Sequence, residues 1–220
     1  MEKTVGAHVG TSPMLLLPVV YVVDDDISVR ESLELLIRTA GWQPELFDSA
    51  QGFLRCPKGA SPSCLILDVK LPGLNGLDLQ KQVAVDRSDM PIIFISGYGD
   101  VPSTVQAMKA GAVEFLTKPF SEETLLNAIR HALERSRSVL AEQAALQDLR
   151  NRFDLLSRRE REVMTLVVRG LLNKQVAFEL GISEITVKAH RGRVMEKMEA
   201  RSFADLVMMA AKLPATPTKD

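Results

Sequence analysis

Residues 19–26 read VVYVVDDD, an apolar run that ends abruptly in three aspartates. A run of β-branched and aromatic residues without polar alternation is typical of a strand buried on both faces, as in a parallel sheet. Comparable runs recur along the chain as far as Leu116. The five expected strands lie at Pro18–Val23, Gln43–Phe47, Cys64–Leu67, Pro91–Ile95 and Val113–Leu116.

Helical patterns separate these runs. In the clearest one, residues 28–40, Ser28 and Glu31 form a capping-box pattern, and Gly41 is expected to end the helix. Strands that alternate with helices predict a doubly wound α/β domain with a five-stranded parallel sheet. We place this domain at residues 18–134. Residues 1–17 are expected to be a disordered N-terminal extension, within which Met14 is an alternative start.

A long helix is expected to follow, capped by Ser121 and running to about Phe153, with residues 135–153 as a linker. Two apolar lines repeat along it every seven residues. They are Leu125, Ala132, Val139, Leu146 and Phe153, and Leu126, Leu133 and Leu140. The repeat favours either a coiled-coil connector that pairs two chains or a solvated helix that extends from the first domain.

Residues 154–213 carry four short helical patterns and no strand pattern, which predicts a small all-α domain. Gly181 marks a turn between the second and third helices. The expected N-caps are Ser157 (with Glu160), Asn173, Ser183 and Ser202. Residues 214–220 are expected to be a loose tail.

Charge is distributed unevenly along the chain, although the net charge is only −1. Residues 150–213 carry 13 basic against 8 acidic side chains, whereas the rest carries 14 against 20. A basic C-terminal segment suits a polyanion such as DNA, although an uneven solvated surface gives the same totals. Cys56 and Cys64 form no metal-ligand pattern, and no stretch resembles a membrane span or an export signal, so we expect a cytoplasmic protein.

Polar side chains follow the expected strands at their carboxyl ends, where ligands bind in open α/β sheets. Asp24 and Asp25 follow the first strand, Asp68 the third, Ser96 the fourth and Lys118 the fifth. Clustered carboxylates repel one another, and a divalent cation such as Mg²⁺ relieves that repulsion and neutralises an incoming phosphoryl group. Asp68, alone on the central strand, is the expected nucleophile, while Lys118 and Ser96 are placed to bind phosphoryl oxygens.

Four segments resemble the signature of receiver domains in two-component systems: VVDDD at 22–26, LDVKLPGLNG at 67–76, ISG at 95–97 and FLTKPF at 115–120. The resemblance implies that Asp68 is phosphorylated, and that Mg²⁺ is bound by Asp25, Asp68 and the Lys70 carbonyl, with Asp24 acting through water. It implies further that Ser96 and Phe115 are the switch residues, that Lys118 completes the pocket, and that the Lys118–Pro119 bond is cis. Asp26 is a candidate cap for the first helix. Residues 97–99 are expected to form a flexible loop that lets Ser96 move.

The third helix of the C-terminal domain, drawn as a helical wheel over residues 184–198, has two distinct faces. Val187, Val194 and Met198 are expected to point inward. The opposite face mixes cations with small side chains, which suits approach to the major groove of DNA. It carries Ile185, Lys188, Ala189, Gly192 and Glu196, flanked by Thr186 and Arg193. Lys174, at the start of the preceding helix, is placed to contact a phosphate.

Three further segments resemble the LuxR-type helix-turn-helix: LSRREREV at 156–163, GLLNKQVA at 170–177 and ISEITVKAH at 182–190. With the receiver-like segments they resemble the NarL/FixJ family, nearest its FixJ-like branch. The implied DNA-binding set is Lys174, Thr186, Lys188, Ala189, Arg191, Gly192 and Arg193. Gly192 stands where many relatives carry a longer polar side chain, so readout of DNA shape is expected to contribute there.

The resemblance implies a phosphorylation-dependent regulator of transcription, with activation favoured over repression. Its implied partners are a sensor histidine kinase, double-stranded promoter DNA and RNA polymerase, with homodimers formed on phosphorylation or through the linker helix. It is not expected to be an enzyme in its own right. A phosphatase with Asp68 as nucleophile is disfavoured because Lys70 stands where that family has a second aspartate. A signalling adaptor is disfavoured by the basic helix-turn-helix segments.

Overall fold

A computed structural model describes residues 17–97 and 101–213 of the chain. Contacts divide the chain into two units, with the division between Leu140 and Ala141, inside one long helix. Met14, nearly all of the expected N-terminal extension, most of the loop at 97–99 and the tail at 214–220 lie outside the described residues. Each unit is therefore described by itself.

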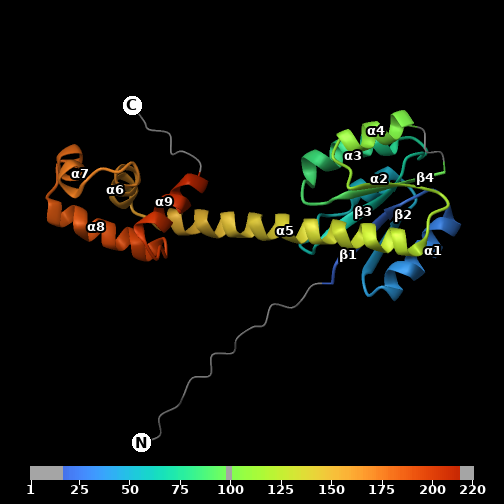
Figure 1. Ribbon diagram of the computed structural model, residues 1–220, viewed down its shortest axis with the longest axis horizontal. Coiled ribbons are helices and arrows are strands. Elements are labelled where there is room, and N and C mark those ends of the chain that lie inside the picture. Colours follow the sequence, from blue (N-terminus) through green and yellow to red (C-terminus); the bar gives the residue numbers. More distant parts are fainter. Residues whose placement is uncertain (1–16, 98–100, 214–220) are drawn as a thin grey trace, which may run out of the picture. The chain divides into compact units, whose positions relative to one another are not determined.

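The first unit is built on five parallel strands in the order β2-β1-β3-β4-β5 (Figure 1). The strands are β1 (Val19–Val23), β2 (Gln43–Phe47), β3 (Ser63–Asp68), β4 (Ile92–Ser96) and β5 (Glu114–Thr117). β1 pairs with both β2 and β3, so the strand that precedes the three aspartates lies inside the sheet. This confirms the predicted five-stranded parallel α/β fold.

Helices cover both faces of this sheet (Figure 1). α1 (Ile27–Thr39) and the first part of α5 (Glu122–Asp154) pack on the face that carries Val20 and Val22. α2 (Ala50–Arg55), α3 (Gly76–Asp86) and α4 (Val101–Lys109) pack on the face that carries Tyr21 and Val23. Alternate residues of a strand point to opposite faces, so both cores are filled by the same apolar runs. With both faces buried, polar chemistry is left to the strand ends.

Two predicted helix starts are wrong. α1 is capped by Asp26, whose side chain accepts a hydrogen bond from the Ser28 amide at 2.8 Å, so Ser28 lies in the first turn and forms no capping box with Glu31. α7 (Asn173–Leu180) begins at Asn173 itself, and the Gln175 side chain accepts from the Leu172 amide at 2.8 Å. The candidate cap Asp26 is thus confirmed for α1, whereas at α7 a side-chain oxygen three residues further along satisfies the backbone amide in place of the expected cap.

The described residues of the second unit form helices joined by short turns, with no strand among them. Besides α7 it contains α6 (Arg158–Val168), α8 (Glu184–Lys197) and α9 (Phe203–Lys212). Val187, Val194 and Met198 are buried, which confirms the predicted inward face of α8. The predicted caps at Ser157, Ser183 and Ser202 are also confirmed.

The seven-residue repeat of α5 is explained largely by the two cores. Leu125, Ala132 and Leu133 are buried against the sheet of the first unit, whereas Phe153 packs into the core of the second. The remaining members, Leu126, Val139, Leu140 and Leu146, are half-buried. A coiled-coil connector therefore stays a prediction, with four apolar positions left to form it. Among residues 17–97 and 101–213, no helix combines the length and apolar character needed to cross a membrane.

An ion pair between a buried carboxylate and a half-buried lysine joins α6 to α8 inside the second unit. Glu160 is only 3 % exposed, and one of its carboxylate oxygens accepts from Lys197 Nζ at 2.7 Å and from the Ser157 amide at 2.8 Å. Burial alone would raise the pKa of Glu160, but these hydrogen bonds outweigh it and lower the pKa to about 2. The pair ties the helix that carries the candidate DNA-binding face to the capping box of α6.

Glu160→Gln is expected to lower the free energy of unfolding by about 1–3 kcal/mol at neutral pH, because it removes charge-assisted hydrogen bonds from a buried site. The folded pKa of about 2 lies below the ordinary value of 4.5, so the stabilisation is present above about pH 4.5 and is lost as the pH falls towards 2. Urea unfolding followed by circular dichroism should show the two proteins converging over that range.

Glu162→Gln is the matched control on the same helix, because Glu162 pairs with the solvent-exposed Arg158 and Arg159. Its unfolding free energy should stay within about 0.5 kcal/mol of the parent. Equal effects of the two substitutions would show that the buried pair has no special role.

Candidate functional site

Three carboxylates meet at the carboxyl edge of the sheet. Asp24 and Asp25 directly follow β1, and Asp68 is the last residue of β3, its neighbour in the sheet. One oxygen from each of the three lies within 4.8 Å of the others. Asp24 is fully buried and Asp68 is 9 % exposed, whereas Asp25 is exposed. The predicted convergence of these three residues is thus present in the structure.

Lys118 bridges two of the three carboxylates from the end of β5. Its Nζ donates to Asp24 Oδ2 at 2.8 Å and lies 3.3 Å from Asp68 Oδ2. Partial burial would lower the pKa of Lys118, but the two carboxylates outweigh it and raise the pKa, so the ammonium is charged. The Lys118–Pro119 peptide bond is cis, as expected.

Asp68 is held in place by its own loop. The Lys70 amide donates to Asp68 Oδ1 at 3.1 Å, which leaves Oδ2 on the side of Lys118. Burial raises the pKa of Asp68 and the charge of Asp24 adds to it, while the Lys70 amide and Lys118 oppose the rise. Gly76 begins α3 against this segment, and a Cβ there would stand 2.4 Å from the Asp68 carbonyl oxygen. Only glycine permits this approach, which gives a structural reason for the glycine that ends the segment LDVKLPGLNG.

The two expected switch residues occupy different positions relative to this cluster. Ser96 ends β4, is almost fully buried, and its carbonyl oxygen accepts from the Lys118 amide at 2.8 Å. Phe115 lies one strand further along, where its ring stacks on Phe94 with centroids 6.1 Å apart. Ser96 therefore lies at the edge of the sheet that carries the acids. Phe115 instead packs on the face of the sheet that α4 covers.

The donor set of the cluster fits a magnesium ion. Three carboxylates lie together against one charged lysine, so the group carries excess negative charge. Its ligand atoms are all oxygens, and Asp25 is exposed, so a hydrated ion has access. Mg²⁺ prefers such carboxylate sites and keeps several of its waters.

Arg30 is a member of the site that sequence reasoning missed. From the second turn of α1 its Nη1 donates to the Asp24 carbonyl oxygen at 2.6 Å. The contact anchors the backbone of the acidic segment, and α1 reaches it only because Asp26 starts the helix immediately after the strand. No local pattern marks an arginine six residues after an aspartate, so only the folded helix reveals it.

The second candidate surface lies on the outward face of α8 and the start of α7. Five of the seven predicted DNA-binding residues are exposed there: Lys174, Lys188, Ala189, Gly192 and Arg193. Three of these five are cations, and the ion pairs found among the described residues of this unit all involve other side chains. The surface is therefore positively charged and open to a polyanion.

The other two predicted residues make contacts within the unit. Arg191 Nη1 donates to Asn173 Oδ1 at 2.7 Å, and its guanidinium lies 5.4 Å from the ring centre of Phe203. Thr186 shares a hydrogen bond of 2.8 Å with the Ser183 hydroxyl at the start of α8. Arg191 thus links α7, α8 and α9, a role that no sequence pattern indicated.

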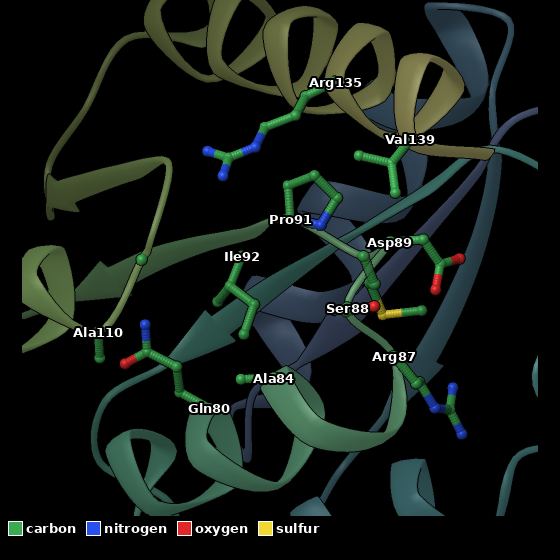
Figure 2. A pocket seen from close by; sticks show the side chains of 12 residues that line it. Gln80, Ala84, Arg87, Ser88, Asp89, Pro91, Ile92, Ala110, Arg135 and Val139 are labelled. Carbon is green, nitrogen blue, oxygen red and sulfur yellow. The ribbon is translucent and has the colours of Figure 1, made fainter. Parts of the chain in front are cut away.

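A separate cavity of about 130 Å³ lies near the start of β4, at the opposite end of that strand from Ser96. Gln80 on α3 and Arg135 on α5 face it from opposite sides (Figure 2). Gln80 Nε2 donates to the Ala107 carbonyl oxygen at 3.0 Å. None of the predicted site residues lines this cavity, so it is distinct from both candidate surfaces.

Comparison with known families agrees with both halves of the chain. Residues 20–130 match the response regulator receiver domain, and residues 154–210 match the bacterial regulatory proteins of the luxR family. The first match contains the acidic cluster and Lys118, and the second contains α6 to α9 up to residue 210. The helix-turn-helix resemblance seen in the sequence is thereby confirmed.

Relatives carry the same two parts in one chain. Nodulation protein W of Bradyrhizobium diazoefficiens is 52% identical over 195 residues, covering 89% of this chain and 86% of that protein. The transcriptional regulatory protein FixJ of the same organism is 42% identical over 193 residues, covering 88% and 94%. The solved structure of the response regulator StyR has a TM-score of 0.81 and 46% identity, covering 90% of this chain and 100% of that one. The chain therefore belongs to the response regulators of the NarL/FixJ family, in which a receiver domain is joined to a LuxR-type helix-turn-helix DNA-binding domain.

Proposed function

We propose that Asp68 accepts a phosphoryl group from a sensor histidine kinase and that this modification controls DNA binding by the second unit. The observation that carries the proposal is the position of Asp68 at a strand end, with two acidic neighbours within 4.8 Å and Lys118 Nζ 3.3 Å from its Oδ2. A nucleophile, a cation and a set of metal ligands are the groups that phosphoryl transfer requires.

Asp68 Oδ2 is the attacking atom in this proposal, because it lies on the side of Lys118, whereas Oδ1 accepts from the Lys70 amide. The P–N bond of a phosphohistidine breaks as the P–O bond to Asp68 forms, and the kinase histidine leaves. Lys118, already charged, offers a donor to the incoming oxygens, and the Ser96 hydroxyl can offer another. The protein thus supplies the nucleophile and the donors that compensate developing charge.

The proposed ligands of Mg²⁺ are Asp25, Asp68 and the Lys70 carbonyl, with Asp24 acting through water. When bound, the ion neutralises charge on the acids and on the phosphoryl oxygens. Asp25 is the exposed member of the cluster and Asp24 is the member paired to Lys118, which supports direct ligation by the first and an indirect role for the second.

Phosphorylation is proposed to act as a two-state bias. Ser96 and Phe115 would reposition, altering the surface near α4 and α5, and a homodimer or a released DNA-binding domain would follow. To move a population from 1:99 to 99:1 requires about 5.5 kcal/mol of difference between the states. Several charge-assisted hydrogen bonds together with a new interface can contribute a free energy of that order.

We further propose a transcriptional activator that acts in the cytoplasm with RNA polymerase. Residues 18–134 would form the receiver domain, 135–153 the linker and 154–213 the DNA-binding domain. The proposed DNA contacts are Lys174, Thr186, Lys188, Ala189, Arg191, Gly192 and Arg193, with Arg191 placing the helices that carry the others.

Asp68→Asn is expected to abolish modification when the protein is incubated with acetyl phosphate and Mg²⁺, because the amide cannot attack phosphorus as a carboxylate does. Intact-mass analysis and mapping of the acyl phosphate measure it, and chelation of the metal should have the same effect on the parent. Asp78→Asn, an exposed acid on α3, is the control and should label normally. Labelling of Asp68→Asn at the parental level would refute the assignment.

Lys188→Ala is expected to weaken binding to a selected promoter duplex by about 1–3 kcal/mol, because Lys188 is exposed at the centre of the proposed contact face. Fluorescence anisotropy over a range of salt concentrations is the measurement, and a phosphate contact at Lys188 would also reduce the salt slope by about 1. Lys212→Ala, an exposed lysine on α9, should bind as the parent does. Identical behaviour of the two variants would remove Lys188 from the contact set.

A further inference from the structure

Ile185 is a large apolar side chain that the fold leaves in solvent. It is the second residue of α8, is 83% exposed, and belongs to neither the buried core of the second unit nor the half-buried residues around it. Single exposed apolar residues are common on proteins, so exposure alone carries no conclusion. The position of Ile185 on the helix is what distinguishes it.

The residues around Ile185 on this face form a surface for a polyanion. Lys188 and Ala189 lie three and four residues further on, which places them beside Ile185 on the helix surface, and both are exposed. Lys174 and Arg193 add exposed cations on α7 and α8. An apolar side chain beside a lysine, on a face that carries further cations, is poorly suited to an apolar protein partner but is compatible with a polyanion that carries a small apolar group.

Gly192 supplies an independent indication that a partner approaches this face closely. A glycine within a helix costs about 0.5–1 kcal/mol relative to alanine. Nothing in the fold requires a glycine at this position. A Cβ at Gly192 would meet no atom within 4 Å, and the backbone φ of Gly192 is negative, as in an ordinary helix. The absence of a side chain at Gly192 is therefore consistent with a bound partner that approaches the helix closely there, one turn beyond Ala189.

The chemistry of the major groove then identifies the group that Ile185 can recognise. The first residues of a recognition helix contact base edges there, and the thymine C5-methyl is the apolar group that those edges present. Ile185 has no donor or acceptor in its side chain and cannot read the polar edges. We propose that Ile185 reads a thymine in each half-site through contact with its C5-methyl group, an inference that rests on the proposed DNA binding by α8.

The test uses the full chain, phosphorylated with acetyl phosphate and Mg²⁺. Duplexes are first selected from a random library, and each thymine of the selected half-site is then replaced in turn by deoxyuridine, which lacks only the methyl group. The parent should lose about fourfold in affinity at one thymine, the value expected for one buried methyl-sized group. Ile185→Ala should bind the unmodified duplex more weakly and lose little further at that thymine, so that the two changes are not additive.

Phe178→Ala is the matched control, because Phe178 is 89% exposed in the same unit but lies on α7. Any effect of that substitution should be equal for all the deoxyuridine duplexes. Alanine has a higher helix propensity than isoleucine, so α8 is expected to stay folded in Ile185→Ala. A melting temperature no lower than that of the parent establishes this.

Two failures are distinguishable. If selected duplexes bind with the expected salt dependence, but every thymine behaves alike in the parent and in Ile185→Ala, the assignment of Ile185 is overturned and DNA binding stands. If no duplex is enriched and no salt-dependent binding is found, the proposed DNA-binding function fails together with the inference.

Discussion

Repulsion among Asp24, Asp25 and Asp68 is the constraint around which the receiver domain is organised. Two charges about 4 Å apart at an effective dielectric near 20 repel by about 4 kcal/mol. Lys118 compensates part of this by contacting two of the three carboxylates. A single ammonium cannot neutralise three acids, so the folded site carries excess negative charge. The proposed affinity for Mg²⁺ follows from bringing these strand ends together.

The sheet is what keeps the acids together against that repulsion. β1 and β3 are paired in parallel from Val19 to Val23, and the register places Leu67 opposite Val23. Asp24 and Asp68 are then the next residues on two hydrogen-bonded neighbours, and neither can retreat without breaking the sheet. Gly76 adds a second constraint, because its missing side chain lets α3 begin directly against the Asp68 backbone. Two apolar cores thus hold one polar edge in a conformation that the acids alone would not adopt.

The same reasoning explains what could be predicted from the sequence. Buried parallel strands can be recognised in a sequence as short apolar runs. Because parallel strands end at a common edge of the sheet, the meeting of Asp24, Asp68 and Lys118 could be predicted from the residues that follow these runs. Helix starts were harder to predict, because Asp26 and Ser28 are both good caps and only the chain path from β1 selects the first. The contacts of Arg30, and of Arg191 with Asn173, join residues whose spacing has no repeating pattern. Such pairs depend on the angles between elements, which the sequence does not show directly.

α5 has a physical property that bears on how the two domains communicate. Its first part is held by Leu125, Ile129 and Leu133 against the sheet, and its last part by Leu149 in the helical core. Between them, residues 141–148 are exposed except for the half-buried Leu146. Isolated helices shorter than about 12–15 residues are marginal in water, so this middle part gains its helicity from the anchors at either end or from a second chain. We therefore expect a change in the receiver that loosens the first anchor to lower the stability of this part of α5.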